Sequence, residues 1–256
     1  MRILMVGDLH GDTAALIKVL ACAVDKGADV IVQLGDFGFW PRVEFGRKFL
    51  RKAEARLAEV GLELWWVDGN HEDHQALATR RIESDGRRRV SDHVWHLPRG
   101  HRWMWGNTVW VAAGGAVSVD RYRGSEGKWW FPDEVLTDTE VDQIIDLGHA
   151  DVIVAHDAPW GAGTLERLFS FDLPPSERQS SWPVDRLEES DTHMRRVGRL
   201  VDGVGAGRFF HGHLHVHYDD ELAAPHGSVE IRGLGDNRTP IDELSLLVDE
   251  TGRPIP

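Results

Sequence analysis

The sequence contains a single cysteine, Cys22, and no apolar run that approaches the length of a membrane-spanning helix. One cysteine cannot form an intrachain disulfide, which suits a reducing compartment. A helix that crosses a bilayer needs about 20 consecutive apolar residues. An expected strand begins at Arg2 and leaves no room before it for a secretion signal. We therefore expect a cytoplasmic protein with no membrane partner.

Basic residues are also in the minority. The chain has 29 lysines and arginines against 42 aspartates and glutamates, a formal net charge of −13. Because proteins neutralise the phosphates of long nucleic acids with basic surfaces, no extended nucleic-acid surface is expected. A nucleotide or a DNA end stays open as a substrate, since bound metal ions can reverse the charge locally.

Length and hydrophobic pattern indicate an α/β protein. The 256 residues, 41% of them hydrophobic, suit one domain over residues 1–256 with a sizeable core. Helical periodicity between short apolar runs, at 12–26 and 45–60, predicts parallel strands joined by helices, with Asp12 as an N-cap and Gly61 as a stop. The apolar runs that read as buried strands are Ile3–Val6, Val30–Leu34, Leu62–Val67, Val152–Ala155 and Arg208–Phe210.

The second half of the chain is less regular. Residues 91–113 are predicted to form short tryptophan-rich strands, and Thr137 with Glu140 forms a capping box before a helix. Residues 160–186 show no period and several prolines, which predicts a long irregular loop. A helix is expected at 187–201, and short strands are expected at 229–231 and 244–248.

A polar cluster follows each of the five apolar runs. The clusters are Gly7-Asp8-Leu9-His10, Gly35-Asp36, Gly69-Asn70-His71-Glu72, His156-Asp157 and His211-Gly212-His213. The carboxyl ends of strands in an open α/β sheet form the crevice where ligands bind, so these side chains should converge. Taken singly, each has a structural reading as a helix cap, a turn residue or a hydrogen-bonded histidine. Together they predict a metal centre.

At these residues the chain resembles the calcineurin-like metallophosphoesterase superfamily, in a bacterial or phage-type form. The pattern of that superfamily is Asp-x-His, Gly-Asp, Gly-Asn-His-Asp/Glu, a lone His, and Gly-His-x-His, in that order. The resemblance extends from Asp8 to His215. It implies mixed β-sheets packed as a sandwich between helices, in four layers.

The resemblance also implies which residues hold two divalent ions, and manganese is the metal we expect. Iron, zinc, cobalt or nickel would also suit the mixed oxygen and nitrogen donors. Asp8, His10 and His213 are assigned to one ion, Asn70, His156 and His211 to the other, and Asp36 bridges them. His215 and His217 receive no ligand role, and the alternation from His211 to His217 reads as a strand.

The implied reaction is hydrolysis of a phosphomonoester or phosphodiester by a hydroxide held between the two ions. His71 corresponds to the histidine that stabilises charge on the phosphoryl or leaving-group oxygen, as a general acid. A nuclease or nucleotide pyrophosphatase is the alternative enzyme, and a non-catalytic binding scaffold of the same fold is the alternative outside catalysis.

The chain departs from the phosphoprotein phosphatases of this superfamily. Those proteins continue Gly-Asp with a further aspartate and an arginine, which orient the catalytic histidine and bind phosphate. Here residues 37–40 are Phe-Gly-Phe-Trp. The departure disfavours a protein phosphatase and leaves Glu72 or Asp73 as candidates to orient His71.

One loop offers substrate-binding residues. Arg121, Tyr122 and Arg123 precede Lys128 and two tryptophans. Cations beside aromatic rings suit a phosphate attached to a base, which predicts a nucleotide-like substrate. A packed surface loop is the alternative.

Overall fold

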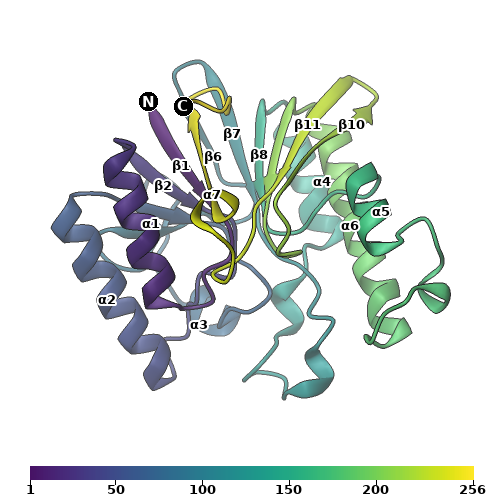
Figure 1. Cartoon of the computed structure of the whole chain (residues 1–256), viewed down its shortest axis with the longest axis horizontal. Coiled ribbons are helices and arrows are strands. Elements are labelled where there is room, and N and C mark those ends of the chain that lie inside the picture. Colours follow the sequence, from purple (N-terminus) through teal and green to yellow (C-terminus); the bar gives the residue numbers. More distant parts are fainter.

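The structure is a computed structural model that describes residues 1–256, and it contains two six-stranded sheets (Figure 1). The first sheet has the order β12 (Ser245–Asp249), β1 (Arg2–Val6), β2 (Val30–Gln33), β3 (Leu64–Trp66), β5 (Val94–His96) and β4 (Arg88–Arg89). The second has the order β10 (Tyr218–Ala224), β11 (Gly227–Gly233), β9 (Arg208–His211), β8 (Val152–Ala155), β7 (Thr108–Ala113) and β6 (Arg102–Trp105).

Both sheets are mixed in the same way. The middle strands β1, β2, β3 and β5 are parallel, and β12 and β4 pair antiparallel at the edges. In the second sheet β11, β9, β8 and β7 are parallel, between antiparallel β10 and β6. All five strands read from the apolar runs are present, so the carboxyl ends of both parallel sets are available to carry a site.

Helices cover the outer face of each sheet. Figure 1 shows α1 (Thr13–Asp25) and α2 (Glu44–Val60) on one side and α4 (Asp138–Asp146), α5 (Gly163–Phe169) and α6 (Val184–Val204) on the other. The short helices α3 (His74–Ala78) and α7 (Ile241–Leu244) complete the set. The predicted ends are confirmed, because the Asp12 side chain accepts from the first backbone N–H groups of α1, and Gly61 ends α2 at φ 69°.

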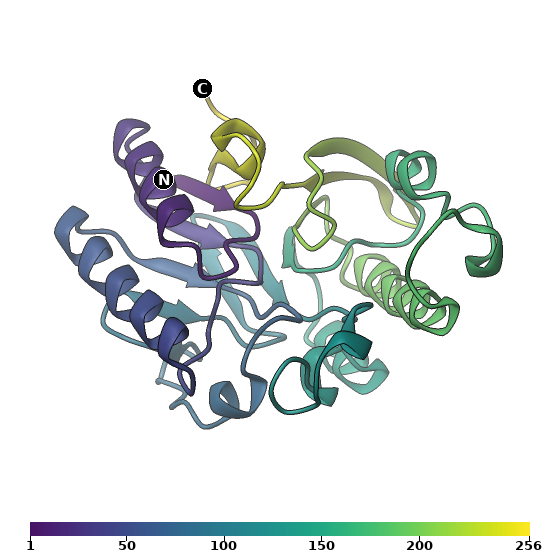
Figure 2. The same ribbon diagram turned by 60° about the horizontal axis from the view of Figure 1, so that its bottom comes forward.

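Alternation along the strands divides the apolar residues into separate layers. In β1, Leu4 and Val6 pack with α1 and α2, whereas Ile3 and Met5 join the cluster between the sheets. In β8, Ile153 belongs to the cluster under α4 and α6. Helix, sheet, sheet and helix therefore form four layers, as predicted (Figure 2).

Three local predictions need correction. Residues 160–186 are not irregular throughout, because they contain α5, a 3₁₀ turn at Pro175–Glu177 and the start of α6. The seven residues of α5 are too few to show a helical period. Leu244 ends α7 instead of opening the last strand. The histidine run is a strand only as far as His211, since His213 and His215 have left-handed φ values of 62° and 57°.

No helix combines the length and the apolar character needed to cross a membrane.

Candidate metal centre

The polar clusters meet where the two sheets present the carboxyl ends of their strands. Asp8, Asp36 and Asn70 follow β1, β2 and β3 of the first sheet. His156 follows β8, and His213 lies two residues beyond β9, both in the second sheet. The centre is therefore assembled from both halves of the molecule, as expected for ligands at parallel strand ends.

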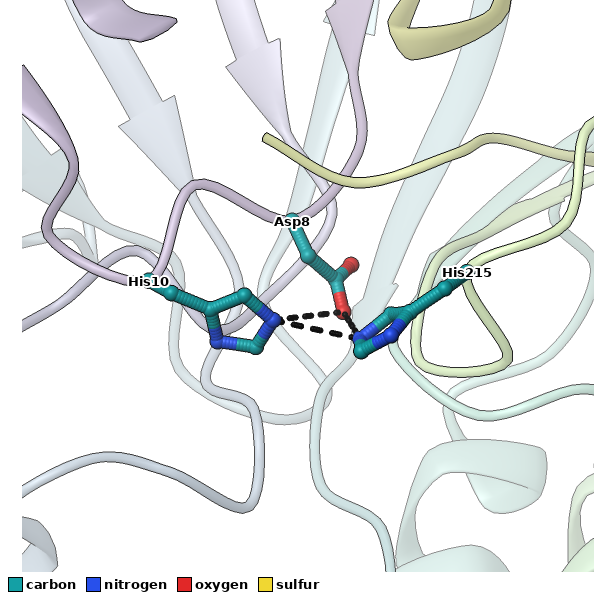
Figure 3. A group of neighbouring side chains, drawn as sticks. All are labelled: Asp8, His10 and His215. Atoms are coloured by element: carbon teal, nitrogen blue, oxygen red, sulfur yellow. Dashed lines mark hydrogen bonds and ion pairs between the residues drawn. The ribbon is translucent and has the colours of Figure 1, made fainter. Parts of the chain in front are cut away.

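One set of ligand atoms joins Asp8, His10 and His215 (Figure 3). Nε2 of His215 lies 3.0 Å from Oδ2 of Asp8 and 3.1 Å from Nε2 of His10. Nε2 of His10 lies 3.9 Å from the same carboxylate oxygen. One oxygen and two nitrogens thus face a common point, which is the donor set of a divalent transition metal.

A second set joins Asp8, Asp36 and His156. Nε2 of His156 lies 3.5 Å from Oδ1 of Asp36 and 3.1 Å from Oδ1 of Asn70. The ring centroids of His213 and His156 lie 5.0 Å apart. The other Asp36 oxygen, Oδ2, lies 3.6 Å from Nδ1 of His10. Asp8 is thus common to both sets, and Asp36 of the second set lies beside the His10 ring of the first.

Two motif glycines are required by the closeness of these ligands. A Cβ at Gly69 would collide with the carboxylate of Asp36, and a Cβ at Gly212 would collide with Oδ1 of Asp8. The backbone N–H of His213 donates to both Asp8 oxygens, at 3.1 and 3.2 Å. The Gly-Asn and Gly-His pairs thus bring the backbone of one cluster against the carboxylate of another.

The protonation of the centre suits metal binding. Burial opposes ionisation of Asp36, but His156, His71 and His10 outweigh it and lower the pKa of Asp36 below its usual range. Burial lowers the pKa of His213 to about 4, so its imidazole is neutral near pH 7. Nδ1–H of His156 donates to the Leu34 carbonyl at 2.7 Å. Burial lowers the pKa of His156, but Asp36 and Asp8 outweigh it and raise that pKa, so a cation at Nε2 would take the place of a proton.

His211 is not brought to this centre. Its Nδ1–H donates to the Gly212 carbonyl at 2.9 Å, and its Nε2 accepts from the Tyr218 hydroxyl at 2.6 Å. Both ring nitrogens are therefore occupied by protein partners. His215, which the sequence reading left without a ligand role, joins Asp8 and His10 instead. The signal was present in the motif, because Gly-His-x-His fits Gly212-His213-Leu214-His215 directly.

His71 lies at the opening of the centre and is partly exposed. Its backbone N–H donates to Oδ1 of Asp36 at 2.8 Å, and its Nε2 lies 3.9 Å from Oδ1 of Asp120. Neither carboxylate suggested from the sequence is free to orient it. Glu72 accepts backbone N–H groups from residues 37–39, and Asp73 caps α3 and pairs with Arg42. Sequence reasoning missed Asp120 because it lies in a different loop.

A cleft of about 910 Å³ opens beside the centre. It is lined by Asp36, Asn70, His71, His213 and His215 of the centre, and also by Val119, Asp120, Arg123 and residues 168–171 and 178–182.

Of the predicted substrate residues, Arg123 lines this cleft and lies over the Trp182 ring, with 4.6 Å from Cζ to the ring centroid. Arg121 turns away to an ion pair with Glu189 and to the Trp130 ring. Tyr122 is exposed, 6.3 Å from Trp182 between ring centroids, and its hydroxyl accepts from Nε of Arg123.

The sequence matches the family model of the calcineurin-like phosphoesterases over residues 1–217, and the chain belongs to that family. Among solved structures it is similar to TT1561 of Thermus thermophilus, with 15% identity, a TM-score of 0.52 and coverage of 92% of this chain and 89% of that one. It is also similar to a dimetal phosphatase from Danio rerio, with 12% identity, a TM-score of 0.59 and coverage of 96% and 91%. At these identities the likeness shows the shared fold. A comparison with curated proteins finds no match.

Family and ligand groups together indicate a metal-dependent phosphoester hydrolase.

Proposed function

We propose that this protein hydrolyses phosphomonoesters or phosphodiesters with a binuclear metal centre, as a phosphatase or phosphodiesterase. The first ion is held by Asp8, His10 and His215. The second is held by Asn70, His156 and His213, and Asp36 is shared. This assignment replaces His211 by His215 and moves His213 to the second ion, because the ring of His213 lies beside that of His156.

The position of Asp36 carries the proposal. Its Oδ1 lies 3.5 Å from Nε2 of His156, and its Oδ2 lies 3.6 Å from Nδ1 of His10, whose Nε2 faces the first set. A carboxylate placed in this way can bind two ions at once. Asp8 and Asp36 bring two negative charges, so two divalent ions would leave the centre cationic and attractive to a phosphate, despite the net charge of −13.

Bound divalent ions would supply Lewis-acid charge and an activated water near neutral pH. The protein provides the remaining groups. His71 faces the cleft beside the shared carboxylate and is placed to protonate the leaving oxygen. Asp120 can hold the protonated ring, since its carboxylate lies near Nε2 of His71.

The substrate is proposed to be small and nucleotide-like. Three arginines line the cleft, and two of them are neutralised, Arg178 by Asp191 and Arg238 by Asp236. Arg123 has no carboxylate within 4.0 Å and lies against an indole ring. A free cation next to an aromatic surface suits a second phosphate and a base. Arg121, already paired with an acid, is left out of this role.

The neutralised arginines also weigh against a nuclease for long strands, which would need unpaired cations along the backbone path. The choice of manganese and the cytoplasmic location stay predictions.

Metal analysis and a substrate panel test the proposal. The protein is stripped with a chelator, reloaded with Mn²⁺, dialysed and analysed for metal, and then assayed on nitrophenyl phosphate, bis-nitrophenyl phosphate and nucleotides. About two ions per chain and metal-dependent hydrolysis are expected. No bound metal after loading would favour the non-catalytic scaffold.

A further inference from the structure

A buried hydrogen-bond chain leads away from Asn70. Nδ2 of Asn70 donates to Oγ of Ser118 at 3.0 Å, and that hydroxyl donates to Oε2 of Glu134 at 2.9 Å. The three residues are 2%, 1% and 1% exposed, so water does not compete for these bonds. Since the amide N–H₂ is turned toward Ser118, the amide oxygen is turned the other way, toward His156.

Glu134 fixes the direction of this chain. Its Oε1 accepts the backbone N–H of Ser118 at 2.8 Å, and its Oε2 accepts that of Phe131 at 3.3 Å. A backbone N–H can only donate, so both oxygens of the side chain have to act as acceptors. An ionised carboxylate meets that demand, whereas a carboxamide offers one acceptor and one donor group.

We propose that Glu134 is a positioning residue for the metal centre. Acting through Ser118, it holds the Asn70 amide with its oxygen toward His156, and so sets the affinity of the second metal site. The inference rests on the proposed function, because it takes Asn70 as a ligand of that site. Partners behind a ligand of this kind are commonly worth about 10–100-fold in metal affinity.

The same carboxylate joins both ends of residues 118–131. That segment carries Asp120 and Arg123, which face the cleft. Glu134 therefore anchors a metal ligand and a cleft wall together. A purely structural role would affect the wall and the fold but leave metal affinity unchanged.

Glu134→Gln tests the inference with almost no change of shape. If the new N–H₂ group faces Oγ of Ser118, the hydroxyl has to donate to Asn70, whose amide then presents N–H₂ to the metal. We expect the second Mn²⁺ to bind about 10–100-fold more weakly while the first binds normally. The readout is a Mn²⁺ titration by calorimetry together with metal analysis. Burial raises the pKa of Glu134 to about 7, so the titration is made at about pH 8, where the wild-type carboxyl is ionised.

A double variant is designed to keep a metal ligand at position 70 when the direction of the hydrogen-bond chain is reversed. In Glu134→Gln with Asn70→Asp, a carboxylate at position 70 can accept from Ser118 and still offer an oxygen to the metal. We expect it to recover the second Mn²⁺ that the single variant loses. General damage to the fold would not be repaired by a second substitution at the ligand itself.

Glu54→Gln is the matched control. Glu54 in α2 also accepts a serine hydroxyl and a backbone N–H, from Ser91 at 2.6 Å and His93 at 3.0 Å, but it belongs to another part of the structure. The Glu54→Gln variant should bind two Mn²⁺ ions, as the wild type does. If Glu134→Gln does not fold, Ser118→Ala decides, and it should weaken the second site.

If Glu134→Gln binds Mn²⁺ at both sites with wild-type affinity, the inference is wrong and the proposed function still stands. The same holds for Ser118→Ala when it is used in place of an unfolded Glu134→Gln. A wild-type protein that binds fewer than two ions would instead count against the proposed function.

Discussion

Nε2 of His10 and Nε2 of His215 lie 3.1 Å apart, although 205 residues separate them in the chain. Oδ2 of Asp8 lies 3.0 Å from the same His215 nitrogen. Two imidazole nitrogens and a carboxylate oxygen at such distances are stable together only with a shared proton or a cation among them. This contact brings His215 to Asp8 and His10, whereas the sequence reading gave His215 no ligand role and assigned His211 to the centre instead.

His215→Ala and His211→Ala should therefore differ. The loss of His215 removes a proposed ligand, so the first ion should bind more weakly by more than the roughly 100-fold typical of a supporting partner. His211→Ala should retain both ions but cost about 1–3 kcal/mol of unfolding free energy, because the buried Tyr218 hydroxyl loses its acceptor. Metal analysis and thermal unfolding of both variants check this. The opposite pattern would restore His211 as the ligand.

Asp36→Asn should abolish turnover while the protein still folds. The change removes one negative charge that faces His10 and His156 together. Steady-state assays with excess Mn²⁺, with circular dichroism for the fold, measure the effect. A near wild-type rate with two ions bound would contradict the shared role of this carboxylate.

His71→Ala should lower kcat by roughly 10²–10⁴ without changing metal content. The loss should be smaller for nitrophenyl esters, whose leaving group needs little protonation. Asp120→Asn should lower kcat in the same direction but less, since its carboxylate lies 3.9 Å from the ring nitrogen. Equal losses of His71→Ala on good and poor leaving groups would leave that histidine with electrostatic stabilisation alone.

Arg123→Ala should raise KM for a nucleotide and barely change the hydrolysis of bis-nitrophenyl phosphate, because contacts remote from the reacting phosphorus matter little to a minimal substrate. Arg121→Ala serves as the matched control. Its guanidinium is paired with Glu189 and faces a neighbouring depression, so nucleotide KM should stay unchanged. If both variants keep wild-type kinetics on every substrate, residues 121–123 only pack on the protein surface and do not bind the substrate.

The buried pair of Asp68 and Arg99 predicts acid sensitivity. Burial would raise the pKa of Asp68, but Arg99 and His96 lower it well below the usual range. A depressed pKa means that this stabilisation is present above the unfolded-state value of about 3.9 and is lost as the pH falls below it. Asp68→Asn should cost about 3–5 kcal/mol at neutral pH and less in acid. Glu140→Gln, the control at the more exposed partner of Arg99, should cost less. Denaturant unfolding at several pH values measures both.

Much of the fold was predictable from local pattern. The strand ends at Val6 and Ala155, and the caps at Asp12 and Thr137, follow from apolar runs and side-chain hydrogen bonds within a few residues. The short helix α5 was not predictable, because seven residues show no period and its packing against β10 comes from far along the chain.

The sequence by itself determined where five strands lie along the chain, the kinds of donor atoms at their ends and hence the class of chemistry. Only the tertiary structure decided which imidazoles turn inward. Left-handed backbone at His213 and His215 breaks the strand alternation, and packing of the two sheets brings His215 to Asp8 while Tyr218 engages His211. The tertiary structure also gave Arg121 and Arg123 different surroundings. Arg121 pairs with Glu189, and that pairing depends on where α6 lies. Donor type is a property of each residue, but the point at which donors meet is set by long-range packing.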